Sequence, residues 1–120
     1  MKRVLAFLTL LAALFLASAC HYNVNLSVDA WTEIAYENGD VIHTEPVTYE
    51  GFHRDVLTDS DLERIFIDLT QHVNPDFKTA VLHLSVFEEI TDSHLRDEDY
   101  GVVYNSRSGH YDFADLNVRY

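Results

Sequence analysis

Apolar and polar residues alternate from Tyr22 to Tyr36, with the apolar side chains on even positions. Thr32 interrupts the apolar face, and Trp31 and Ala35 interrupt the polar one. A repeat of two residues is the period of a β-strand that buries one face. The segment therefore predicts one long, half-buried strand with a tryptophan on its otherwise polar side.

A hairpin is predicted directly after this strand, because the Asn and Gly of Asn38-Gly39-Asp40 accept positive φ. Val41 to Tyr49 would form the returning strand. Pro46 places that strand at a sheet edge or bends it, since proline cannot donate to the hydrogen-bond ladder. Thr79 to Glu88 predicts a second strong strand, which is apolar on one face and partly apolar on the other, as suits a central position.

One helix is predicted between these strands. An apolar stripe recurs there at three- and four-residue spacing, at Leu62, Ile65, Phe66, Leu69 and Val73. Ser60 and Glu63 are spaced as a capping box at its N-terminus, and Asn74-Pro75 ends it.

The C-terminal part predicts a loop and a hairpin. Ile90 to Asp99 is acidic and predicts a solvated loop. Gly101 to Asn105 and His110 to Tyr120 predict the strands of a closing hairpin. In the second strand the apolar positions change from odd to even, which predicts a bulge near Ala114-Asp115.

These elements predict an α+β domain in the order β-β-α-β-β-β. Neither one helix nor an antiparallel sheet is stable in water unless its apolar face is buried. We therefore expect a two-layer sandwich, with a mostly antiparallel sheet of about five strands and one helix packed on it. A small barrel-like sheet with the helix plugging one end is the alternative.

Residues 1–20 have a different pattern, in which Lys2 and Arg3 precede an apolar run from Val4 to Leu16. The run is shorter than the roughly 20 apolar residues of a membrane-spanning helix, and it suits the hydrophobic region of a signal peptide. Its end, Leu16-Ala17-Ser18-Ala19-Cys20, resembles the lipobox of bacterial lipoproteins. The resemblance implies cleavage before Cys20 and fatty acylation of that residue.

Two interpretations of this end stay open. An ordinary A-x-A cleavage site would leave Cys20 incidental. The lipoprotein interpretation explains a lone cysteine, since exported domains normally pair their thiols. It predicts a signal peptide at 1–19, one acidic envelope domain at 20–120, and a membrane anchor through Cys20. Because His21 rather than Asp follows the cysteine, the resemblance implies the outer membrane, with the domain facing the periplasm.

Net charge and sequence motifs limit the classes of function that this protein can have. Without Lys2 and Arg3, six cationic residues remain against twenty acidic ones, a net charge of −14 with histidine neutral. Such a surface argues against nucleic acid and favours a cationic partner. No serine lies in a G-x-S-x-G or S-x-x-K context, and no glycine-rich phosphate loop is present. We expect neither an enzyme nor a cofactor.

Seven histidines are the compositional anomaly. None is spaced as in H-E-x-x-H or H-x-H, so surface or hydrogen-bonded histidine is the simpler interpretation. His83 and His110 would meet if their strands paired. That pairing would support the alternative function, a zinc- or copper-type metal-binding lipoprotein.

Trp31 is the candidate partner-binding residue, because a tryptophan on a polar face is a frequent anchor of protein interfaces. A covering loop or layer would make it a core residue instead. The sequence thus favours a small acidic envelope lipoprotein that binds protein or supports an assembly, an inhibitor of a cationic enzyme being one form. A hydrolase assembled from distant residues is the weaker alternative.

Overall fold

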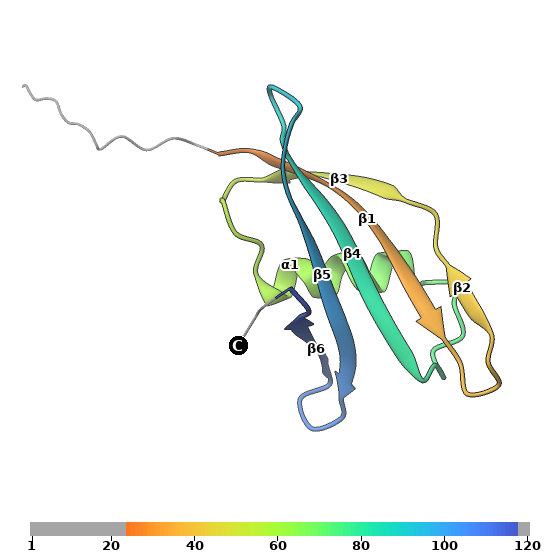
Figure 1. Ribbon diagram of the computed structural model, residues 1–120. Helices are drawn as coiled ribbons and strands as arrows, with labels where there is room; N and C mark the ends of the chain where they lie inside the picture. Colours follow the sequence, from red (N-terminus) through yellow and green to blue (C-terminus); the bar gives the residue numbers. More distant parts are fainter. Residues whose placement is uncertain (1–23, 118–120) are drawn as a thin grey trace, which may run out of the picture.

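The computed structural model describes residues 24–117, which form an antiparallel sheet with one helix against it (Figure 1). The predicted signal peptide, Cys20 and residues 118–120 lie outside this range. The α+β class and the pairing of one helix with an antiparallel sheet are confirmed.

The described elements run in the order β-β-β-α-β-β-β, one strand more than expected. They are β1 (Leu26–Ala35), β2 (Val41–His43), β3 (Val47–Phe52), α1 (Asp59–Leu69), β4 (Thr79–Glu88), β5 (Ser93–Asn105) and β6 (His110–Asp115).

β1 and β4 form the centre of the sheet and pair from Leu26↔Glu88 to Ala35↔Thr79. β5 and then β6 follow on the far side of β4. β2 and β3 both pair with β1 on its other side. The central position predicted for β4 is confirmed, because the strand has a partner on each side.

The extra strand comes from Pro46, which lies between the end of β2 and the start of β3. Next to it, the Thr44 hydroxyl accepts from the Thr32 amide at 2.9 Å, and the Thr44 amide donates to the Thr32 carbonyl at 3.0 Å. These bonds keep the backbone groups of the buried Thr32 paired where the ladder is interrupted. The edge position predicted from the proline is confirmed.

The helix begins two residues before the predicted capping box, since its N-cap is Thr58 rather than Ser60. The Asp61 amide donates to the Thr58 hydroxyl at 3.2 Å, and the Thr58 amide donates to the Asp61 carboxylate at 3.0 Å. The Ser60–Glu63 prediction is therefore wrong. Both pairs have the same spacing, and the extended backbone of Thr58 decides between them.

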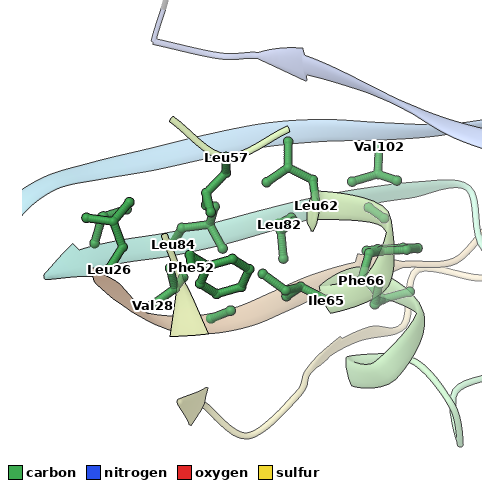
Figure 2. Packing of buried hydrophobic residues seen from close by; sticks show 14 residues of the cluster. Leu26, Val28, Phe52, Leu57, Leu62, Ile65, Phe66, Leu82, Leu84 and Val102 are labelled. Atoms are coloured by element: carbon green, nitrogen blue, oxygen red, sulfur yellow. The ribbon is translucent and has the colours of Figure 1, made fainter. Parts of the chain in front are cut away.

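The core lies between α1 and one face of the sheet (Figure 2). Leu62, Ile65 and Phe66 of the helix are at most 2 % exposed and pack on the even-numbered residues of β1 and β4. Phe66 makes an edge contact with Tyr111 of β6, with ring centroids 4.9 Å apart. The predicted helix stripe is core at these three positions.

Two predictions for the C-terminal part are wrong. Residues 93–99 are the first half of β5 rather than a loop, because β4 pairs with them and supplies their ladder partners. The predicted bulge near Ala114-Asp115 is absent from the described chain, where β6 pairs with β5 in unbroken register until it ends at Asp115. The bulge in this half of the sheet lies instead where Val86 is followed by Phe87.

Candidate functional site

The candidate site is the sheet face that points away from α1, which no described element covers (Figure 1). Along β1 and β4, buried core positions alternate with half-buried positions on this open face. Its central members come from four strands. They are Asp29, Trp31 and Glu33 of β1, Val81, His83, Ser85 and Phe87 of β4, Asp97 and Asp99 of β5, and His43 of β2.

One row of side chains crosses the middle of the open face. Trp31 lies opposite His83, and His83 lies opposite Asp99. The indole stacks on the imidazole with ring centroids 4.1 Å apart and planes 20° apart. The ring of His43 is tilted against the indole, with the two ring centroids 5.9 Å apart. Trp31 is therefore half-buried by two histidine rings while it stays on the solvent side of the sheet.

His83 lies between two carboxylates. Its Nδ1 is 2.6 Å from Oδ1 of Asp99, and its Nε2 is 3.7 Å from Oε1 of Glu33. An ionised carboxylate only accepts, so Nδ1 carries the proton of this hydrogen bond. In the neutral ring Nε2 is then an acceptor, and it is buried without a hydrogen-bond partner.

The Asp99–His83 pair has the composition of a general-base dyad, but its geometry does not suit that role. A general base must lie within hydrogen-bond reach of the proton that it removes. The available nitrogen, Nε2, has less than 1 Å² of exposed surface. The hydrogen bond from His83 to Asp99 instead orients the imidazole ring on which Trp31 stacks.

A second row of polar side chains lies beside the first. The hydroxyl of Thr48 donates to Asp29 at 2.6 Å, and the hydroxyl of Ser85 donates to Asp97 at 3.0 Å. His94 contacts the same Asp97 carboxylate at 2.8 Å. Hydrogen bonds from His94 and Ser85 lower the pKa of Asp97, which keeps this exposed carboxylate ionised.

The strand residues of the open face include more acidic than basic side chains. Asp29, Glu33, Asp97 and Asp99 lie on its central strands, whereas the described cationic residues lie elsewhere. Arg54 and Arg64 contact Asp61 of the helix. Arg96 contacts Glu98 and the Asp55 carbonyl. Lys78 precedes β4, and Arg107 lies in the β5–β6 turn. The face thus offers carboxylates to a ligand with no described arginine or lysine among its strand residues.

The two histidines of the metal alternative are not brought together. β4 pairs with β1 and β5, so His83 lies opposite Asp99, whereas His110 of β6 lies opposite Asn105. Asp99 and Asn105 are six residues apart along β5, about 20 Å at the usual strand rise. His110 contacts Glu63 of the helix at 3.0 Å instead. Within residues 24–117, no group of three or more His, Cys, Asp or Glu side chains is placed to hold a metal ion.

Trp31 is where the sequence places it, on the polar side of the first strand. The sequence reasoning missed the residues that surround it, namely Glu33, His43 and Asp99. The odd-position pattern of β1 pointed to Glu33, but His43 and Asp99 come from strands whose register no local pattern reveals. Cys20, the predicted lipidation site, lies outside the described residues.

Comparison with known proteins identifies no relative: no family model matches the chain, and no curated protein or solved structure does. The described helix is too short and too polar to cross a membrane.

Proposed function

We propose that this protein is a small acidic cell-envelope lipoprotein that binds a cationic envelope protein without catalysing a reaction. Lipidated Cys20 would hold it at the outer membrane, and the open face around Trp31 would be its contact surface. The observation that carries the proposal is the Trp31–His83 stack, which displays an indole on an acidic face that no described element covers.

The position of Trp31 supports this role. Partly buried aromatic residues at the centre of a patch, ringed by polar groups, account for much of the energy of protein interfaces. Trp31 has Asp29 and Glu33 beside it on β1 and is packed against His83 and His43. Packing against the two histidine rings holds the indole in one orientation before binding, so little side-chain entropy is lost when a partner covers it.

The charge of the face supports a cationic partner. Opposite potentials steer two proteins together and raise the association rate, and salt weakens that steering. Acidic residues alone serve solubility equally well. The separation of the described arginines and lysines from the open face is the feature that favours recognition.

The lipid anchor would limit how far the face can reach. β1 begins at Leu26, six residues after Cys20. Six residues span at most about 20 Å when fully extended. A partner would therefore be met close to the membrane surface rather than deep in the periplasm.

The test uses affinity capture from detergent-solubilised envelopes, comparing the full chain with Trp31→Ala. A partner specific to the open face is expected to be captured by the wild type, lost at high salt, and reduced at least about tenfold by Trp31→Ala, since interface anchors contribute about 2 kcal/mol or more. Tyr104→Ala is the matched control, because Tyr104 is 54 % exposed and packs on Tyr111 at the β5–β6 hairpin. Equal capture by wild type and Trp31→Ala would contradict the proposal.

A further inference from the structure

Three histidines share the open face with its carboxylates. His83 comes from β4, His94 from β5 and His43 from β2. The charged groups that face them are Asp29 and Glu33 of β1 and Asp97 and Asp99 of β5. Imidazole is the side chain that ordinarily changes charge between pH 5 and 8, whereas carboxylates ordinarily titrate near pH 4. The open face therefore carries, beside its carboxylates, the residue type whose side chain ordinarily gains a proton in this range.

The second ring nitrogen of His83 faces a carboxylate. Its Nδ1 already donates to Asp99 at 2.6 Å, and its Nε2 is buried without a partner, 3.7 Å from Oε1 of Glu33. Adding a proton to Nε2 turns this unpaired atom into a donor that faces a carboxylate. The imidazolium would then lie between two anions, with both nitrogens facing an acceptor.

We propose that the open face binds arginine- or lysine-rich protein surfaces in a pH-dependent manner, with His83 as the internal competitor for its carboxylates. This inference rests on the proposed function and adds its regulation. At neutral pH, Glu33 receives no hydrogen bond from His83, and Asp99 accepts only the one from Nδ1, so both carboxylates can still accept from the cations of a partner. In mild acid, a second proton on His83 would add a donor that faces Glu33, and the positive charge of the ring would compete with a partner's cations for both carboxylates. A proton on His94 would likewise place positive charge beside Asp97, which His94 contacts at 2.8 Å.

Competition of this kind is reciprocal. If protonation of His83 weakens the binding of a cation, binding of the cation must expel the proton to the same extent. The partner would therefore be held near neutral pH and released as the surroundings acidify. The release requires no change in the fold, because Trp31, His83 and Asp99 lie on strands with paired neighbours on both sides.

The experiment uses the full-length chain in neutral detergent at low salt, with a fluorescently labelled hexa-arginine peptide as the probe. Binding at pH 7.5 is expected to be about tenfold tighter than at pH 5.5, a difference of about 1.4 kcal/mol. His83→Asn keeps an N–H donor near Asp99 but cannot take up a proton, so it should bind at pH 7.5 and lose most of the pH dependence. His110→Asn is the matched control, because His110 contacts Glu63 of the helix, and it should keep the wild-type dependence.

A second readout is local to the site and needs no partner. Trp31 is the only tryptophan of the chain, and its ring is in stacking contact with His83. Protonated imidazole quenches the fluorescence of an indole that it touches. Wild-type emission should therefore fall between pH 7.5 and pH 5.5 while the circular dichroism is unchanged, and the fall should be absent from His83→Asn.

The outcomes separate the two proposals. Equal affinity for hexa-arginine at both pH values would overturn the pH dependence and leave the cation-binding face in place. A pH dependence that survives in His83→Asn would overturn the assignment to His83. Absence of binding at pH 7.5 and low salt would overturn both this inference and the cationic partner of the proposed function.

Discussion

The Glu63 carboxylate of α1 accepts a hydrogen bond from the backbone amide of Tyr111, with Oε2 3.1 Å from the nitrogen. The same carboxylate contacts Nδ1 of His110 at 3.0 Å. β6 is the last strand of the sheet, and an unpaired amide on such an edge is a template for pairing with another chain. Glu63 thus joins the helix to the edge strand and occupies one of its backbone donors.

Removal of this contact should destabilise the domain. Glu63→Ala leaves the Tyr111 amide without its carboxylate, and hydrogen bonds to charged groups contribute about 1.5–3 kcal/mol. We expect a loss of about 1–2 kcal/mol in urea unfolding, with a greater tendency to self-associate measured by light scattering. Ser60→Ala, at an exposed position on the same helix, is the control and should change stability by less than about 0.5 kcal/mol. A Glu63→Ala protein as stable as Ser60→Ala would show that the contact is incidental.

Phe66 should be the most sensitive position of the helix. It is 0 % exposed and lies between Phe77, Tyr111 and Phe113. Truncation of a buried phenylalanine costs about 3–5 kcal/mol, so Phe66→Ala should unfold the domain or lower its melting temperature steeply. Ile67→Ala removes an apolar side chain that is 49 % exposed one residue along, and its melting temperature should stay close to that of the wild type. Equal effects of the two variants would contradict the helix orientation.

Stability should decline in alkali partly through Tyr49. Burial, together with the hydrogen bond from the Tyr49 hydroxyl to Asp68, raises the pKa of Tyr49 above its ordinary value of 10. The stability linked to this raised pKa is complete below pH 10 and is lost as the pH rises beyond it. Tyr49→Phe should therefore be less stable than the wild type at pH 7 and lose less stability between pH 9 and pH 11 in urea unfolding.

Two further tyrosines serve as comparisons for the measurement on Tyr49. Burial and a hydrogen bond to Glu98 also raise the pKa of Tyr100, so Tyr49→Phe should keep part of the alkaline decline. Tyr104→Phe makes the same chemical change at an exposed position and is the control. A decline in Tyr49→Phe as steep as in the wild type would argue against the Asp68 contact in solution.

Anchoring is testable without any knowledge of the partner. Cys20→Ser removes the thiol that lipidation requires, so the protein should move from the membrane fraction to the soluble periplasmic fraction. Mass spectrometry of the wild type should show a fatty-acylated cysteine at the mature N-terminus. A soluble wild-type protein with an unmodified cysteine would favour ordinary A-x-A cleavage and remove the membrane from the proposed function.

Local pattern by itself determined which residues face the core. A period of two residues assigned one side of β1 and β4 to the interior, and a period near 3.6 did the same for Leu62, Ile65 and Phe66, because burial repeats with the geometry of the backbone. The same reasoning placed Trp31 on the outer side of its strand. Pro46 marked the sheet edge because a missing amide is a property of one residue and needs no partner to be recognised.

Tertiary structure decided everything that depends on register. Residues 93–99 carry too few apolar side chains to signal a strand, and they form one because β4 supplies their hydrogen-bond partners. That pairing brings Asp99 to His83, and the pairing of β1 with β4 brings His83 to Trp31. A shift of one residue in either register would turn these side chains to opposite faces. The buried surface of the whole sheet sets the register, so the site around Trp31 arises only when the chain has folded.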